Sequence, residues 1–286
     1  MSTVGAMIER VHRDLYGSHR AVLNRLDAAI TTTDTALVTE FSTNEIAEGD
    51  YLAIEDEVLY VWDFVEGTKT ATVQRAMQGS TAVAHSDATL IEIGPRFPRG
   101  HIRQAMLDEI RSWPNSLFAT DSLAASMTAG DRAISTSSIS GYKRVLEVLR
   151  NPWTDAEDTK VELAFREERS ANAIYLTHAI DSAVTVTIYY AKAFDVDPFT
   201  DAIDLQTDVG LTAGMEDIVL YGAQWRLIAP RETRRSDTQA QGESRNASEV
   251  PSDSAMRTAA RLKAIRDERI IDEAERLISV YPWRRR

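Results

Sequence analysis

Residues 49–61, Gly49-Asp50-Tyr51-Leu52-Ala53-Ile54-Glu55-Asp56-Glu57-Val58-Leu59-Tyr60-Val61, decide the fold class. A turn, a short apolar run, an acidic turn and a second apolar run follow one another, and this pattern is typical of a β-hairpin. Similar short runs lie at 36–41, 70–75 and 90–93, separated by turns about ten residues apart. Residues 30–93 are therefore predicted to form a small antiparallel β-barrel module.

Helical patterns lie on both sides of this module. An amphipathic stripe predicts a helix over 7–29, in which Gly17-Ser18 permits a kink or two shorter helices. Another helix is predicted over 99–113, ended by Pro114. Residues 215–229 favour a buried helix, 231–252 a long polar loop, and 252 or 254 to 280 a final helix.

A second β region is predicted from about 117 to 213. Residues 184–190 are β-branched and aromatic throughout and form the clearest strand. Residues 141–149 fit a strand or a helix, and the Asn-Pro pair that follows favours the strand. Residues 195–214 are predicted to be a long, acidic, solvated connection.

Together these segments predict an α+β fold: a discontinuous helical bundle with two inserted antiparallel β modules of the small barrel or sandwich type. The helical core comprises 1–29, 94–116 and 214–286, and the inserted modules comprise 30–93 and 117–213. Each helix has an apolar face too small to be buried alone, so packing the helices into one layer is the economical arrangement.

Composition excludes several classes of protein. The chain has 286 residues, a net charge of −12 and no cysteine, which excludes disulfides, thiolate zinc sites, iron–sulfur clusters and cysteine nucleophiles. Residues 226–286 hold 14 Arg and Lys against 10 Asp and Glu, a net charge of +4, whereas residues 1–225 carry −16. No apolar run suits a signal peptide or a membrane helix, so we expect a cytosolic product without a membrane partner.

The sequence offers no catalytic signature, and we predict no enzyme activity, cofactor or metal. Motifs such as GxSxG, the phosphate-binding glycine loop and HExxH do not occur. His85 and Asp87 could join a carboxylate from 55–57 in a metal site, but turn chemistry is favoured. The aspartates of 195–208 resemble a calcium loop only loosely, because Thr200 stands where that loop needs glycine. His12 and His19 lie seven residues apart, a spacing that favours surface histidines over a zinc pair.

The aromatic residues divide into two groups. Trp62 and Trp225 are predicted to be core residues. The tail Tyr281-Pro282-Trp283-Arg284-Arg285-Arg286 leaves two interpretations open. Tyr281 and Trp283 fold back on the final helix, or Trp283 anchors in a partner's groove while the arginines pair with acidic groups or phosphates.

Several stretches resemble proteins of tailed phages. Residues 49–61, followed by 73–81 and Ala84-His85, resemble a small β module common in tailed-phage virion proteins. Residues 95–99 with the helix over 102–113, residues 217–227, residues 249–251 and the ending 281–284 resemble neck proteins of long-tailed phages of actinobacteria. The likeness covers most of the chain, and its best match is the head-to-tail adaptor, or connector.

The resemblance implies a structural virion protein of the neck, present in the host cytoplasm during assembly. Adaptors are helical subunits with β insertions that form a ring, usually of twelve copies, beneath the portal. The implied partners are the portal protein, a head-to-tail stopper or tail-tube protein, further copies of the chain, and genome DNA that passes through the channel without specific binding. Tyr281 to Arg286 is then the candidate portal-docking segment, and 231–252 is a candidate for ordering at subunit contacts. An acidic body suits a DNA channel, because it repels phosphates.

Two rival functions remain open. A tail or baseplate structural protein would bind host glycan on outward β modules, and would have aromatic grooves there and a trimeric or hexameric state. A virion-associated hydrolase would need a convergent cluster of carboxylates in a cleft, and no such cluster is evident in the sequence.

Overall fold

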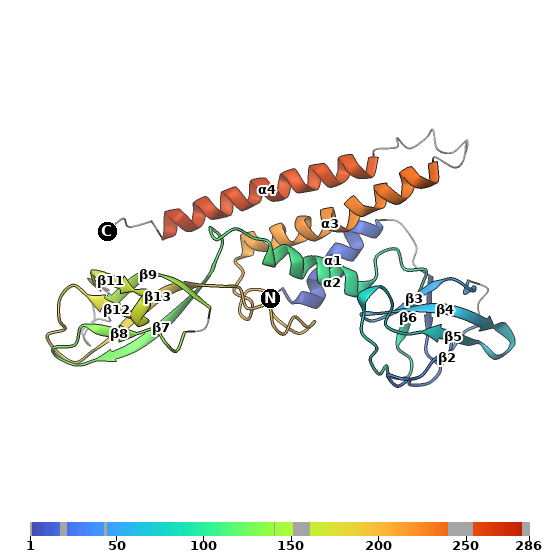
Figure 1. Ribbon diagram of the computed structural model, residues 1–286, viewed down its shortest axis with the longest axis horizontal. Coiled ribbons are helices and arrows are strands. Elements are labelled where there is room, and N and C mark those ends of the chain that lie inside the picture. The colour runs from blue at the N-terminus through green and yellow to red at the C-terminus, as the bar shows by residue number, and fades with distance from the viewer. Residues whose placement is uncertain are drawn as a thin grey trace.

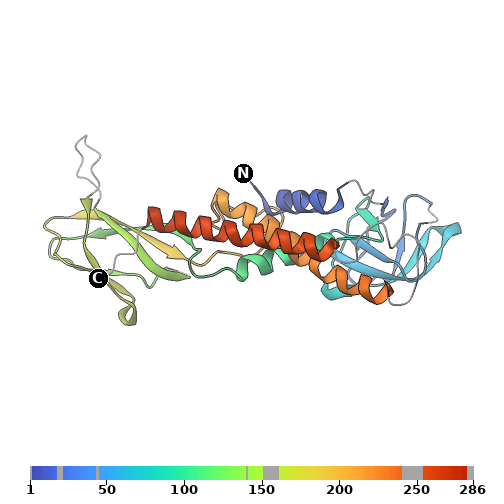
Figure 2. The ribbon, with the colours of Figure 1, turned by 90° about the horizontal axis from the view of Figure 1, so that it is seen from above.

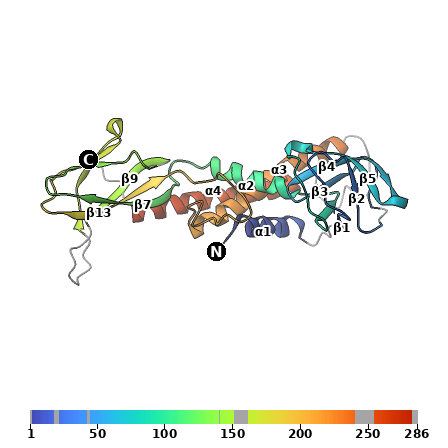
Figure 3. The ribbon, with the colours of Figure 1, turned by 90° about the horizontal axis from the view of Figure 1, so that it is seen from below.

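The computed structural model describes residues 2–17, 22–42, 45–139, 141–150, 161–239 and 254–281. Four α-helices and antiparallel sheets make up the described chain, which confirms the α+β class. The molecule is elongated, with the helices in the middle and strands at both ends (Figure 1). Strands β1 to β6 gather at one end, and β7, β9 and β13 lie at the other (Figure 3).

The helices share one apolar core. They are α1 (Val4–Tyr16), α2 (Arg99–Arg111), α3 (Ala213–Gln239) and α4 (Ser254–Val280). The α3 helix packs against the other three, and α4 runs back beside it along the outside of the molecule (Figures 1 and 2). Buried side chains from all four helices, such as Val11, Met106, Ile218 and Leu277, fill the space between them.

The first group of strands forms one curled antiparallel sheet. Its members are β1 (Val22–Arg25), β2 (Ala36–Val38), β3 (Tyr51–Ile54), β4 (Glu57–Val65), β5 (Thr70–Gln74) and β6 (Leu90–Ile93), in the order β1-β6-β3-β4-β5-β2. A bridge between Leu26 and Thr39 joins the ends of the two edge strands, so the sheet closes on itself around its own core. The predicted runs 51–54 and 90–93 coincide with β3 and β6.

The second group of strands forms two sheets over a third core. They are β7 (Ala119–Met127), β8 (Ala133–Ser135), β9 (Tyr142–Arg150), β10 (Val161–Glu162), β11 (Phe165–Glu168), β12 (Ala173–Leu176) and β13 (Val184–Lys192). Their orders are β10-β9-β13-β7 and β11-β12-β8. The strand over 184–190 is confirmed and lies inside its sheet, where Val186 and Ile188 are buried. The favoured strand over 141–149 is also confirmed. Three short 3₁₀ turns complete the described elements: η1 (Glu66–Thr68), η2 (Met77–Gly79) and η3 (Arg169–Ala171).

The helix predicted over 7–29 is wrong beyond Tyr16. Gly17 takes a φ of 55° and donates its N–H to the carbonyl of Arg13, which ends the helix. The two shorter helices that Gly17-Ser18 permitted do not form either, because residues 22–25 are strand β1, paired antiparallel with β6. The curled sheet therefore begins at Val22, eight residues before the predicted boundary at 30.

Three further expectations need correction. The α3 helix continues through Pro230 to Gln239, where a loop was predicted from 231; residues 240–252 lie outside the described ones. The acidic connection is not a solvated loop, because Leu205, Val209 and Leu211 are buried in the helical core. Trp62 is 58% exposed rather than a core residue. It lies at a register shift between β4 and β5, on the face opposite the buried Leu59 and Val61.

Candidate functional site

A buried carboxylate holds three of the helices together. Glu109 on α2 is fully buried and accepts hydrogen bonds from Trp113 Nε1 at 2.9 Å, Arg226 Nε at 2.9 Å and Arg266 Nε at 2.6 Å. Arg226 lies on α3 and Arg266 on α4, so one anion links α2 to the hairpin formed by α3 and α4. Sequence reasoning missed this group; its only local signal is one acid within the apolar stripe of the helix over 99–113.

The C-terminal end of α4 is the predicted docking end of the chain. Tyr281 donates its backbone N–H to the Leu277 carbonyl at 2.8 Å, and its side chain is partly buried against the helical core. The fold-back interpretation therefore holds for Tyr281. Pro282, Trp283, Arg284, Arg285 and Arg286 lie outside the described residues.

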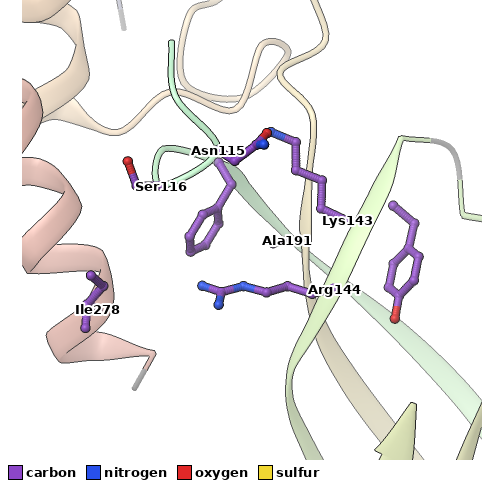
Figure 4. A pocket seen from close by; sticks show the side chains of 8 residues that line it. Asn115, Ser116, Lys143, Arg144, Ala191 and Ile278 are labelled. Atoms are coloured by element: carbon purple, nitrogen blue, oxygen red, sulfur yellow. The ribbon is translucent and has the colours of Figure 1, made fainter. Parts of the chain in front are cut away.

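A cavity of about 490 Å³ lies beside this end of α4. It opens between α4 and the sheet of β7, β9 and β13, and Figure 4 shows the side chains around it. Its lining is Asn115, Ser116, Phe118, Tyr142, Lys143, Arg144, Ala191 and Ile278. Residues distant in sequence thus meet here, and only Ile278 comes from α4.

One wall of the cavity is cationic and its floor is apolar. The Arg144 guanidinium lies 4.9 Å from the centre of the Phe118 ring, within the range of a cation–π contact. Burial lowers the pKa of Lys143 and of Arg144, because desolvation disfavours their charged forms. An acidic or aromatic group of a partner chain would find both charge and apolar contact in this cavity.

A second polar cluster lies inside the curled sheet. The fully buried Glu57 side chain accepts two hydrogen bonds from Arg75, each at 2.7 Å, and lies 2.9 Å from Nε2 of His85. Burial acts to raise the pKa of Glu57, but the hydrogen bonds from Arg75 and His85 outweigh it and lower the pKa. Arg75 also donates to the carbonyls of Thr31 and Val83, so the cluster ties loops to strands.

This cluster occupies the place of the weighed metal site. His85 does reach Glu55 and Glu57, but Asp87 is exposed and the Arg75 guanidinium already neutralises Glu57. Within the described ranges, no three His, Asp or Glu side chains are grouped so that they could hold a metal ion. His85 is a buried, hydrogen-bonded member of the cluster inside the curled sheet.

The aspartates of the acidic connection have structural partners. Asp201 pairs with Arg99 at 2.8 Å and also with Arg103, both on α2. Asp204 accepts the backbone N–H groups of Gln206 and Thr207, each at 2.9 Å. These contacts fasten the connection to the helical core, and the loose likeness to a calcium loop finds no support in them.

The two histidines predicted at the surface are not seen as a pair. His12 stacks on Tyr16, while His19 lies outside the described residues.

An aromatic row lies on the outer face of the curled sheet. Tyr51, Tyr60 and Trp62 follow one another on β3 and β4, with ring centres 5.4 Å and 4.9 Å apart and edge-to-face geometry. Of these three rings Trp62 is exposed, whereas Tyr51 and Tyr60 are half-buried. Trp225, the other predicted core tryptophan, is partly buried on α3.

Within the described ranges, no helix is both long enough and apolar enough to cross a membrane. The sequence matches no protein-family model and no curated protein.

Proposed function

We propose that the chain is a head-to-tail adaptor of a long-tailed phage, which forms a ring beneath the portal and joins capsid to tail. In this proposal the four helices are a discontinuous bundle and the two groups of strands are insertions that hang from it. The observation that carries the proposal is the end of α4, where the chain leaves a folded platform at Tyr281 beside a cation-lined cavity. A docking peptide binds more tightly when the residue before it is already held in place, because less conformational freedom is lost on binding.

Ring formation requires two different contact faces on each subunit, and the shape of the chain supports such an arrangement. A closed ring uses a heterologous interface, in which two different faces of each subunit meet. The elongated subunit offers separate faces on its helices and on both groups of strands (Figure 1). The charge of −16 on residues 1–225 supports a channel that DNA crosses without binding, because like charges repel.

The tail is the proposed contact with the portal. Trp283 supplies a large apolar anchor, and Arg284 to Arg286 supply donors for carboxylates. Tyr281 belongs to the folded subunit, since it packs on the helical core. The docking segment is therefore narrowed to 282–286, with Tyr281 as its fixed base.

The test is the mass of the complex formed when the chain is co-expressed with the portal protein of the same phage. We expect a ring of adaptor on the portal, and we expect Trp283→Ala to abolish docking while leaving the folded subunit unchanged. Trp62→Ala is the matched control, because it removes an exposed tryptophan on β4, far from the C-terminal end of α4 (Figure 1). A wild-type chain that never joins the portal, or a Trp283→Ala chain that docks normally, would overturn the proposal.

A second candidate function rests on the aromatic row of Tyr51, Tyr60 and Trp62. Exposed aromatic rings stack on sugar rings, so the exposed Trp62, which lies beside the half-buried Tyr60, favours a tail or baseplate protein that binds host glycan. The test measures binding of host cell-wall polysaccharide to the chain, with tryptophan fluorescence as the signal. Here Trp62→Ala should abolish binding and Trp283→Ala should not, the reverse of the outcome expected for an adaptor.

A further inference from the structure

A bulge in β9 turns two neighbouring cations toward the cavity beside α4. On β13, Ala191 pairs with Arg144. The next residue, Lys192, pairs with Tyr142, so Lys143 is an extra residue that forms the bulge. Neighbouring side chains of a regular strand point to opposite faces, whereas a bulge re-aims one of them. As a result, Lys143 and Arg144 line the same cavity.

The cavity combines positive charge with apolar surface. Arg144 extends toward Ile278, and Lys143 extends toward Asn115 (Figure 4). Phe118 lies beside Arg144, with its ring centre 4.9 Å from the guanidinium group. The eight described residues of the lining include two cations and no acid. Ile278 is 41% exposed, so its apolar side chain remains open to a ligand.

Burial places a free-energy cost on the two cations. Desolvation lowers the pKa of Lys143 and of Arg144, and the nearby Glu167 offsets only part of the lowering of the Arg144 pKa. An anion in the cavity would favour the charged form of both side chains, since opposite charges attract more strongly where water is excluded. The cavity is therefore suited to a carboxylate.

We propose that this cavity binds an acidic peptide segment of a partner protein, with a carboxylate on Lys143 and Arg144 and an apolar side chain against Ile278. Guanidinium and ammonium groups both form charge-assisted hydrogen bonds with carboxylates. The cavity adjoins the end of α4 that precedes residues 282–286, so one partner can engage both. The identification of that partner as the portal protein rests on the proposed function.

Charge and exposure select this occupant over two others. The chain's own tail carries arginines at 284–286, and like charges repel, so the tail does not suit a cavity that contains Lys143 and Arg144. Single-stranded nucleic acid binds where cations accompany aromatic faces on which bases stack. Here the Phe118 ring is 2% exposed, and the open apolar side chain is the aliphatic Ile278. At about 490 Å³ the cavity also lies within the usual range of ligand pockets, about 300–1,000 Å³.

A cavity contact and a tail contact on one partner reinforce each other. Ile278 lies four positions before Pro282 in the sequence. Once one contact has formed, the other forms at the high effective concentration that a short connection provides. Loss of the cavity contact should therefore weaken docking without abolishing it, whereas Trp283→Ala abolishes it.

The test is binding of a labelled peptide to the full chain, measured by fluorescence anisotropy. The probe has one leucine between two pairs of glutamates, and we expect a Kd of about 100 µM or tighter. Arg144→Gln should weaken binding about 10-fold, because one charge-assisted contact is lost. Lys263→Gln is the matched control, since it removes one exposed cation of α4 about 22 Å along the helix from Ile278 and should leave binding unchanged.

A second variant and two further probes separate charge from shape. Ile278→Asp places a carboxylate at the cavity and should also weaken binding at least about 10-fold, because it repels the acidic peptide. Its half-exposed position leaves the helical core intact, which circular dichroism checks. A probe with glutamines in place of the glutamates should bind at least about 10-fold more weakly. A thymidine oligonucleotide of the same length should not displace the peptide.

Four results would overturn the proposal. They are a wild-type chain that does not bind the peptide, variants at 144 and 278 that both bind as wild type does, a glutamine probe that binds equally well, and displacement by the oligonucleotide. Self-association of the wild-type chain in sedimentation velocity, lost in Arg144→Gln, would instead identify a second copy as the occupant and would also count against it.

Failure of the proposed function has a different signature. In that case the chain binds the peptide through the cavity, with the losses described for Arg144→Gln and Ile278→Asp, and never joins a portal. A chain that joins the portal equally well with and without Arg144→Gln would retain the proposed function and refute the cavity contact.

Discussion

Gly222 on α3 lies closer to neighbouring atoms than the other glycines of the described chain. A Cβ atom added to Gly222 would lie 2.2 Å from Cγ of Glu109 on α2, far inside van der Waals contact. Glu109 has no freedom to retreat, because its carboxylate accepts hydrogen bonds from Trp113, Arg226 and Arg266. We predict that Gly222→Ala destabilises the helical core, although alanine is the better helix former.

The magnitude follows from three contributions. Replacing glycine by alanine inside a helix favours the folded state by about 1 kcal/mol. If Glu109 stays in place, overpacking costs about 1–3 kcal/mol, and if it moves, the broken buried ion pair costs about 3–5 kcal/mol. The lower part of the second range applies, because Arg226 and Arg266 are 26% and 14% exposed and can turn to water. The expected net loss of unfolding free energy is about 2 kcal/mol.

The assay is urea denaturation followed by far-ultraviolet circular dichroism, arranged as a double-mutant cycle with Glu109→Ala. Truncating Glu109 removes the obstacle, so Gly222→Ala in that background should be neutral or stabilising by up to about 1 kcal/mol. Gly67→Ala is the control, because a Cβ there meets no atom within 4 Å. If Gly222→Ala costs the same with and without Glu109, the two residues do not interact as described.

Three further predictions concern the curled sheet and its junction with α1. Arg75→Met leaves Glu57 buried without its cation and should lower the unfolding free energy by about 3–5 kcal/mol, and adding Glu57→Gln should recover part of that loss in thermal unfolding. Despite burial, the hydrogen bonds from Arg75 and His85 hold the pKa of Glu57 below its usual value. The contribution of Glu57 to the unfolding free energy is therefore present above about pH 4.3 and lost as the pH falls through the lower folded pKa, and Glu57→Gln should flatten the fall in urea midpoint below about pH 4.3. Burial and the hydrogen bond to Glu92 raise the pKa of Tyr16 to about 12, so the contribution of Tyr16 to the unfolding free energy is intact below about pH 10 and lost as the pH rises through about 12. Tyr16→Phe should therefore remove the fall in urea midpoint over that alkaline range. An alkaline fall that is the same in Tyr16→Phe and wild type would contradict this prediction.

Local sequence determined the elements whose pattern repeats over a few residues. The hairpin of β3 and β4, the strands β6, β9 and β13, and the helices α2 and α4 all lie where periodicity and turn residues placed them. Their side chains alternate or recur at one spacing, and that spacing, together with the flanking turn residues, favours strand or helix. The class of fold followed from these elements.

Tertiary structure decided the features that depend on contacts between distant residues. Residues 22–25 continue a helical stripe in sequence, yet pairing with β6 makes them a strand. The acidic connection carries apolar residues without regular spacing, and only the helical core gives them a place to be buried. Trp62 faces solvent because it lies on the face of β4 opposite the buried Leu59 and Val61, and the curl of the sheet decides which face is covered.

The same division holds for the candidate sites. The composition of the tail is visible in the sequence, because it is local. Glu109 meets Arg266 from 157 residues away, and the cavity beside Ile278 is lined by residues of separate segments. Such contacts depend on how helices and sheets pack. A carboxylate or a guanidinium group can be buried without a large cost only when a partner from a distant segment forms hydrogen bonds with it.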